Sequence, residues 1–235
     1  MKSCIMSNGE EDMNKVGIIL AMQKELELFA GSLSDLKIEK IHHLNFYGGK
    51  LNNMDVVAVV CGTGKVNAAL GTALLLENFQ PDLLLNIGIS GGLDSTLEIG
   101  DFVVADAVVY HDVWCGEPNL YGQVQDLPAQ FFPEPNLSAK FPNYRHGLLC
   151  CGDRFISEAQ ELQLIKQHFP TALAVDMESA AIAQTCFLYR CPFFCVRQIS
   201  DTPGVKHHAA QYDAFWQNAP QNSIRALHTV LENLG

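Results

Sequence analysis

Acidic residues stand at the ends of three apolar segments of the sequence. Glu25 follows the first apolar run, in AMQKE, at the start of a helical segment whose N-terminal end favours an anion. Asp176 and Glu178 occur in VDMES, and Asp201 closes the apolar run of VRQISD. Partial desolvation, which we expect for Asp201, favours the protonated acid, so that a carboxyl group can donate a proton near neutrality. The pattern predicts acid–base chemistry.

Each of these acids also has a purely structural explanation. Helix-start electrostatics accounts for Glu25, capping for Asp176, and an Asx-type turn before Pro203 for Asp201. Capping explains only one acid of VDMES, however. A carboxylate in this segment suits the vicinal hydroxyls of a ribose, which the acid of dinucleotide-binding folds also recognises. The residues alone leave both explanations open.

Two glycine-rich segments follow other apolar runs, CGTGK at residues 61–65 and NIGISGGL at 86–93. Glycines in such turns let the backbone approach a ligand closely and aim its amides at it. Neither segment matches the dinucleotide pattern G-x-G-x-x-G or the phosphate-binding pattern G-x-x-x-x-G-K-[ST]. A Rossmann-type dehydrogenase is therefore disfavoured, while two tight turns without a ligand explain the glycines equally well.

The segments that must position these groups alternate between strand and helix. Apolar, β-branched runs predict strands over residues 16–21, 44–49, 54–61, 82–87, 101–110, 147–151, 173–175 and 193–199. Helices are predicted over 24–32, from 65, from a capping box of Ser157 and Gln160 to about 169, over 178–189, and over 212–234 with a kink or break at Pro220. Residues 88–92 are expected to form a turn and residues 113–144 an irregular segment. The alternation predicts a mostly parallel sheet with helices on both faces, which binds ligands beyond the carboxyl ends of its strands.

Composition limits the classes of function. The 235 residues include 26 acidic and 15 basic side chains, for a net charge of −11, and 48% are hydrophobic. An acidic chain without a basic stripe is a poor partner for nucleic acid. The apolar run at 16–22 is shorter than a membrane span, and residues 1–12 lack the apolar core of a signal peptide. We expect a flexible extension over 1–12, one domain over 13–235, and no membrane partner.

Cysteine and histidine give little sign of a metal centre. The eight cysteines lie mostly in apolar runs, so we expect buried, reduced thiols in a protein of the cytoplasm. Cys186, Cys191 and Cys195 come nearest to a ligand cluster, and packing explains them better than zinc. His111 and Asp112 have no third ligand at a suitable spacing, and we expect an exposed loop histidine there. We predict neither a metal nor an organic cofactor.

Ordered segments from Val16 onward carry a resemblance to a known family. They are VGIILAMQKELELF, CGTGKVNAALGTALLLE, PDLLLNIGISGGL, GDFVVADAVVYHD, CGDRFIS, AVDMESAAIA and PFFCVRQISD. In this order they resemble the nucleoside phosphorylase/hydrolase superfamily, and within it the bacterial 5′-methylthioadenosine/S-adenosylhomocysteine nucleosidases. The resemblance implies a three-layer α/β/α fold around a mixed, mostly parallel sheet. It also implies hydrolysis of an adenine thionucleoside to adenine and a 5-substituted ribose, in a homodimer whose neighbouring loop helps close each pocket.

Carried over residue by residue, the resemblance implies three catalytic side chains. Glu25 resembles the acid that holds and deprotonates the attacking water, and Arg197 resembles the arginine near that water. Asp201 resembles the acid that protonates or hydrogen-bonds N7 of adenine and also holds the exocyclic amine. A proton on N7 matters because adenine leaves poorly as an anion, and general acid assistance of this kind is worth roughly 10²–10⁴-fold.

The resemblance also implies the substrate contacts. Met177 resembles the methionine that packs against the ribose, and Glu178 the acid that binds its 2′- and 3′-hydroxyls. Phe155 resembles the aromatic residue stacked on adenine, and Ile156 would offer backbone hydrogen bonds to the purine edge. The implied substrate-binding set is Met22, Ile89, Ser90, Gly91, Phe155, Ile156, Met177, Glu178 and Ser200.

Some positions depart from the family pattern. Ile89 stands where the nucleosidases have a small polar residue that helps position the water, and Ser90 lies one place later. The sequence WCGEPNLY at 114–121 diverges from the loop that closes over the thioalkyl group. Preference among 5′-methylthioadenosine, S-adenosylhomocysteine, 5′-deoxyadenosine and aminofutalosine therefore stays open.

Two further functions compete with hydrolysis, those of a purine nucleoside phosphorylase and of a non-catalytic nucleoside binder. Glu25 disfavours the phosphorylase, because phosphate calls for arginines and oriented amides at that place.

Overall fold

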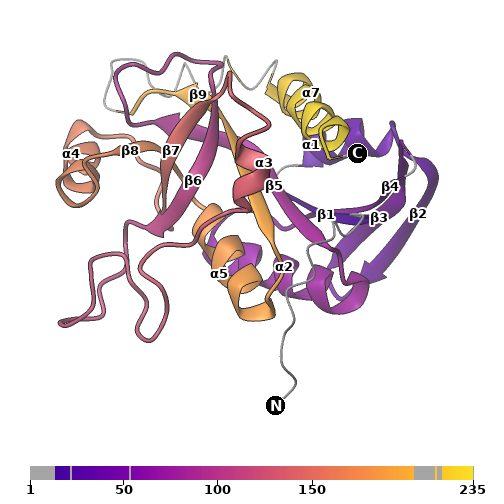
Figure 1. The fold of residues 1–235 in the computed structure, drawn as a ribbon, viewed down its shortest axis with the longest axis horizontal. Helices are drawn as coiled ribbons and strands as arrows, with labels where there is room; N and C mark the ends of the chain where they lie inside the picture. The colour runs from indigo at the N-terminus through magenta and orange to yellow at the C-terminus, as the bar shows by residue number, and fades with distance from the viewer. Residues whose placement is uncertain (1–13, 22, 53, 204–214, 216–218, 235) are drawn as a thin grey trace.

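A mixed sheet of nine strands organises the part of the chain that the structure describes, a computed structural model of residues 14–21, 23–52, 54–203, 215 and 219–234 (Figure 1). Its strands lie in the order β2-β3-β4-β1-β5-β8-β7-β6-β9, and β9 also pairs with β5, so that the last five close into a ring. They are β1 (Lys15–Leu20), β2 (Ser34–Ile41), β3 (Leu44–Leu51), β4 (Met54–Val60), β5 (Leu83–Gly92), β6 (Phe102–Tyr110), β7 (Arg145–Cys151), β8 (Ala172–Asp176) and β9 (Phe193–Asp201).

The contact between β5 and β8 brings two carboxyl ends together. Strands β1, β4, β5 and β9 run in parallel, so their carboxyl ends lie at one edge of the sheet. Strand β8 is antiparallel to β5 and pairs with it only through Gly91–Val175 and Gly92–Ala174. Because the two strands overlap only near their last residues, the chain leaving β8 meets the chain leaving β5. Segments that follow β1, β5, β8 and β9 therefore converge on one place.

Helices cover both faces of the sheet. On one face α1 (Gln23–Ala30) packs against α7 (Ala219–Glu232), and on the other α2 (Lys65–Phe79) packs against α5 (Ser179–Tyr189) (Figure 1). In β1, Val16, Ile18 and Leu20 belong to the core shared with α1 and α7, whereas Ile19 belongs to the core shared with α2 and α5. A strand buried on both faces is apolar at consecutive positions. The predicted three-layer α/β/α arrangement is confirmed.

Predictions of local structure fail at three places. The sequence does not predict β2, an edge strand that is exposed almost throughout and has no buried face. Residues 88–92, expected as a turn, continue β5 because their backbone pairs with β9 and β8. The capping box of α4 (Ala159–His168) consists of Glu158 and Glu161 rather than Ser157 and Gln160, one residue later than predicted.

The remaining segments follow the expectations where the structure describes them. The irregular segment at 113–144 contains one short helix, α3 (Pro135–Ser138). Pro220 is the second residue of α7, a place where proline is tolerated because the first-turn amides have no partner within the helix. The expected helix start at 212 and the expected extension over 1–12 lie outside the described residues. One domain over 13–235 stays a prediction.

Candidate active site

A cavity lies where these chain ends converge. Its empty space is about 900 Å³, a figure that includes solvent at its open side. Met22 lies outside the described residues. All other residues of the predicted site line the cavity: Glu25, Ile89, Ser90, Gly91, Phe155, Ile156, Met177, Glu178, Arg197, Ser200 and Asp201. The structure thus brings together groups from the ends of five strands, β1, β5, β7, β8 and β9.

Glu25 reaches the cavity from the first turn of α1, just after β1 ends. The residue is 0% exposed. Burial without compensation is costly for a carboxylate, and the amides of the helix N-terminus offset part of that cost by favouring a negative charge. The neighbouring Leu26 and Phe29 are buried in the core and fix the rotation of the helix, so that Glu25 faces the cavity.

Arg197 is held in place by two partners. Its Nε donates a hydrogen bond to Asp176 Oδ2 at 2.8 Å, and its Nη1 donates to the Asn86 carbonyl oxygen at 3.1 Å. The other oxygen of Asp176, Oδ1, accepts hydrogen bonds from the amide and hydroxyl of Ser179 at the start of α5. The N-cap residue of α5 is Glu178 rather than Asp176, but Asp176 does satisfy the first amide of the helix. Asp176 also fixes the buried guanidinium of Arg197 beside the cavity, a role that helix capping alone does not explain.

Glu178 is held by the CGTGK segment. Its Oε1 accepts a hydrogen bond from the Gly64 amide at 2.8 Å. Gly64 has a φ of 95°, a conformation that favours glycine, and an added Cβ would lie 3.1 Å from Asp153 Oδ1. Burial, with the nearby charge of Asp176, raises the pKa of Glu178 to about 7. The glycine segment thus forms a tight turn and also positions a carboxyl group at the cavity.

Asp201 lies at the end of β9 and is only 2% exposed. The Ser200 hydroxyl lies within hydrogen-bond distance of both Asp201 Oδ1 and the Ser90 carbonyl oxygen, and it donates to one of them at a time. A Cβ at Gly91 would lie 3.3 Å from Asp201 Oδ2, so glycine permits this close approach. The buried Ser90 Oγ has no hydrogen-bond partner among the described residues and remains available to a ligand.

An apolar wall faces these polar groups. Phe155 is 48% exposed and lines the cavity together with Ile156 and Met177. An aromatic ring that remains half open to solvent provides a flat face for stacking a planar ligand. Polar groups at one end and an apolar wall along the side are the usual composition of a small-molecule site.

The sequence reasoning missed an ion-pair network at the edge of the cavity. Asp112 Oδ2 accepts hydrogen bonds from Lys65 Nζ at 2.7 Å and from the Asp153 amide at 2.9 Å, and Asp153 Oδ1 accepts one from the Lys65 amide at 2.7 Å. The network joins the start of α2, which holds Glu178, to the turn that carries Phe155. The sequence offered one sign of this network, because charged residues directly follow predicted strands in CGTGK, YHD and CGD.

His111 corrects another expectation, because it is buried rather than exposed. Its Nε2 has no hydrogen-bond partner among the described residues, and burial lowers the pKa of its imidazole. In the part of the chain that the structure describes, no three His, Cys, Asp or Glu side chains gather as metal ligands. No helix in that part is both long and apolar enough to cross a membrane.

Comparisons with known proteins agree with this arrangement. The family model for the phosphorylase superfamily matches residues 15–232. A 5′-methylthioadenosine/S-adenosylhomocysteine nucleosidase of Staphylococcus epidermidis is 38% identical over 93% of this chain and 100% of its own. The S-adenosylhomocysteine nucleosidase of Streptococcus pyogenes, in complex with 5-methylthiotubericidin, has a TM-score of 0.91 at 36% identity and covers 97% of this chain and 100% of its own. The 5′-methylthioadenosine/S-adenosylhomocysteine nucleosidase of Colwellia psychrerythraea, in complex with adenine, has a TM-score of 0.89 at 36% identity. It covers 94% of this chain and 96% of its own. The similarity extends over every segment that lines the cavity.

Proposed function

The chain belongs to the phosphorylase superfamily, and from this membership and the charge of its cavity we infer that it hydrolyses the N-glycosidic bond of adenine thionucleosides. Its substrates are 5′-methylthioadenosine and S-adenosylhomocysteine, the compounds for which relatives at 36–38% identity are named. The products are adenine and a 5-substituted ribose. Water and a pair of carboxyl groups supply the chemistry, so the reaction calls for neither a metal nor an organic cofactor.

The charge of the cavity lining is the reason for inferring that water, rather than phosphate, attacks the ribose. Acidic side chains outnumber basic ones in its lining, with Glu25, Asp176, Glu178 and Asp201 against Arg154 and Arg197. Both arginines already pair with a carboxylate, Arg197 with Asp176 and Arg154 with Glu161. Phosphate would need positive side chains and oriented amides to hold its charge, whereas water is neutral and needs only a base. The cavity therefore favours hydrolysis over phosphorolysis.

At the water end, Glu25 acts as the general base. It holds the water and takes its proton while the oxygen bonds to C1′ of the ribose. Arg197, fixed by Asp176 and Asn86, places a positive charge at the same cavity. Ser90 Oγ is a further hydrogen-bonding group for the water, at the place where Ile89 offers none. Ser90 and Ile89 both lie at the carboxyl end of β5.

At the adenine end, Asp201 gives a proton to N7 as the bond between C1′ and N9 breaks. The Ser200 hydroxyl orients its carboxyl group. Phe155 stacks on the purine, and the backbone of Ile156 binds its edge. Met177 packs against the ribose while Glu178 accepts hydrogen bonds from the 2′- and 3′-hydroxyls. This assignment is supported by the burial of Asp201 and by the apolar wall opposite it.

An assay of the purified protein tests the proposed function. Free adenine is followed after adding 5′-methylthioadenosine or S-adenosylhomocysteine, with and without phosphate. Release at the same rate in both conditions is expected. A strict dependence on phosphate would assign the chain to the purine nucleoside phosphorylases. The panel includes 5′-deoxyadenosine and aminofutalosine, and a clear preference for aminofutalosine would place the chain among the aminofutalosine hydrolases.

The pKa of Glu178 predicts how ribose binding depends on pH. A carboxylate accepts hydrogen bonds from two hydroxyls, and Glu178 becomes ionised only as the pH rises through about 7. We expect the affinity for an uncleaved 5′-methylthioadenosine analogue to rise about tenfold between pH 6 and pH 8, as the ionised fraction does for a group that titrates near 7. Isothermal titration calorimetry measures this change.

A matched ligand and a variant make this test specific. The 2′-deoxy analogue and the Glu178→Gln variant should both show weaker binding and a flatter pH profile. The same steep rise with either of them would locate the titrating group elsewhere.

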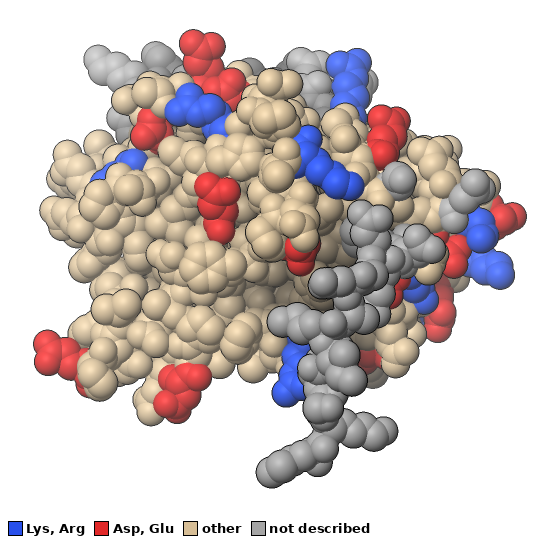
Figure 2. Space-filling model, in the orientation of Figure 1, with Lys and Arg blue, Asp and Glu red and all other residues tan. Residues whose placement is uncertain are grey.

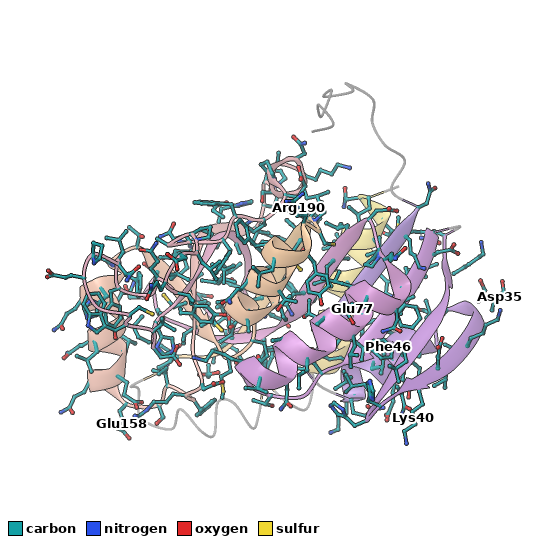
Figure 3. All side chains as sticks on the ribbon, turned by 90° about the horizontal axis from the view of Figure 1, so that it is seen from below. Asp35, Lys40, Phe46, Glu77, Glu158 and Arg190 are labelled. Atoms are coloured by element: carbon teal, nitrogen blue, oxygen red, sulfur yellow. The ribbon has the colours of Figure 1, made fainter. Side chains whose placement is uncertain are left out.

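We propose that the protein is a homodimer formed through the outer surfaces of α2 and α5. Val66 and Leu70 on α2, and Leu188 on α5, are apolar yet 48–70% exposed. The two helices lie side by side (Figure 3), and each contributes exposed apolar side chains to their outer surface. Figure 2 shows few charged side chains over the region where α5 and the β6–β7 connection lie in Figure 1. A second copy would remove such a face from water. Closure of the cavity by the neighbour's loop rests on resemblance and stays a prediction.

Sedimentation velocity tests the dimer. Leu70→Glu places a charge in the apolar face and should shift the protein to the monomer. Leu164→Glu on α4, an equally exposed position on another helix, should leave the dimer intact. A Leu70→Glu protein that sediments like the unchanged protein would show that this face is not the interface.

We also place the protein in the cytoplasm, because the cysteines of the described residues are free thiols and reducing compartments keep them so. The net charge of −11 makes nucleic acid a poor partner.

A further inference from the structure

Two cysteines meet where α5 ends. Arg190 has a left-handed φ of 58°, and the Cys191 amide donates a hydrogen bond to the Cys186 carbonyl oxygen at 3.0 Å. This six-residue hydrogen bond after a left-handed residue is the mark of a Schellman motif, in which the side chains at the two ends of the bond meet. Here both of those side chains are thiols that interact with each other, and the Cys191 thiol also donates a hydrogen bond to the Pro81 carbonyl oxygen at 3.7 Å. Figure 3 labels Arg190 at this end of α5.

The two thiols differ in acidity and in access. Burial raises the pKa of the Cys186 thiol well above its usual range. The interaction with Cys186 lowers the pKa of the Cys191 thiol, which is only partly buried. Because the thiolate is the nucleophile, Cys191 is the sulfur suited to react first. Cys186 lies in contact with it and is suited to react second.

A second cavity provides access to the pair. It lies between the end of α5, the start of β9 and residues 128–135, and both cysteines line it. Much of the remaining lining is proline and phenylalanine, including Phe131, Pro133 and Phe187. These side chains do not compete as nucleophiles, and a small uncharged molecule enters such a cavity at a lower desolvation cost than an ion does. The cavity is distinct from the one lined by Glu25 and Asp201, because the two share no residue.

We propose that Cys186 and Cys191 form a redox site that hydrogen peroxide converts reversibly into a disulfide. The Cys191 thiolate attacks one peroxide oxygen, the O–O bond breaks, the other oxygen leaves as hydroxide, and Cys191 becomes a sulfenic acid. The Cys186 sulfur then attacks the Cys191 sulfur, and its proton leaves with the displaced hydroxyl as water. Overall two thiols are oxidised, and one peroxide is reduced to two waters. A dithiol reductant reverses the change by thiol–disulfide exchange.

The other described cysteines do not share this arrangement. Cys195 is fully buried, and its thiol donates to Asn86 Oδ1 at 3.6 Å, away from the pair. Cys115 is exposed in the irregular segment and provides an internal comparison for simple accessibility. If the two thiols were only packing groups of the core, the exposed Cys115 would be oxidised before them. The proposal requires the opposite order.

Tryptic mapping tests the proposal directly. Arg190 separates the two cysteines, so trypsin places Cys186 in peptide 167–190 and Cys191 in peptide 191–197. Reduced protein is treated with hydrogen peroxide for increasing times, then alkylated and digested. We expect a cross-linked pair of these peptides, lighter than their sum by two hydrogens, that forms about tenfold faster than oxidation of Cys115. Dithiothreitol should remove it. Peptide 191–197 also contains Cys195, and a Cys195→Ala variant must retain the link.

Variants identify the order of the two sulfurs. In Cys186→Ser, dimedone should trap a sulfenic acid on Cys191, whereas Cys191→Ser should leave Cys186 reduced. Neither residue lines the cavity of Glu25 and Asp201, so adenine release by both reduced variants should be unchanged and will show that they are folded. Oxidation of Cys115 while peptides 167–190 and 191–197 stay reduced and unlinked would overturn the proposal. A link that persists in the Cys191→Ser variant would overturn it as well.

Discussion

Replacing Asp201 with asparagine is expected to abolish turnover of 5′-methylthioadenosine while largely preserving the binding of an uncleaved analogue. The amide keeps the volume of the carboxyl group and can still hydrogen-bond the purine, but it cannot give a proton to N7. Without that proton adenine must leave as an anion. The expected loss in kcat is roughly 10²–10⁴-fold, the usual value of one general acid. Adenine release under saturating substrate measures the rate, and calorimetry measures the affinity.

Asp55→Asn is the matched control for this variant. Asp55 is an exposed residue of β4 that pairs with Lys50, far along the sheet from the cavity. The same chemical change there should leave kcat and affinity as they are. If Asp201→Asn turned over at a near-normal rate, another group would protonate the adenine and the assigned role would be wrong. A parallel loss of analogue binding would instead indicate a damaged cavity.

The sequence predicts the layers of the fold because burial on both faces leaves a clear pattern. The run Leu83–Leu85 in β5 is apolar at every position, as a strand between two layers of helices must be. Strand β2 leaves no such pattern, because it lies at the edge of the sheet and is exposed almost throughout. Its place depends on backbone pairing with β3 rather than on burial.

The site residues were predicted as separate groups, and only the fold brings them together. Glu178 and Asp201 each stand after an apolar strand, which is a signal in the sequence. Their meeting depends on the antiparallel overlap of β8 with the last residues of β5, and no local pattern encodes that overlap. For the same reason residues 88–92 resemble a turn in the sequence but form paired strand in the structure. The network of Lys65, Asp112 and Asp153 joins three turns that are distant in the sequence, so no local pattern predicts it either.

Replacing Glu25 with glutamine is expected to remove hydrolysis about as completely as the change at Asp201. A glutamine amide can still hold a water molecule, but it cannot take its proton at neutral pH. The attacking group would then be neutral water without a base, and the expected loss is roughly 10²–10⁴-fold in kcat. KM should change little, because the ribose and adenine contacts come from Glu178, Phe155 and Asp201. Initial rates of adenine release at several substrate concentrations separate kcat from KM.

Glu27→Gln is the control on the same helix. Glu27 is exposed, two residues beyond Glu25, and its side chain hydrogen-bonds Gln23. Its replacement should leave both kcat and KM unchanged, which separates the chemistry at residue 25 from any effect on α1. Thermal unfolding of both variants shows whether the helix is intact. An active Glu25→Gln protein would place the base at another carboxyl group of the cavity, and because Asp176 is committed to Arg197 and Ser179, Glu178 would be the residue to replace next.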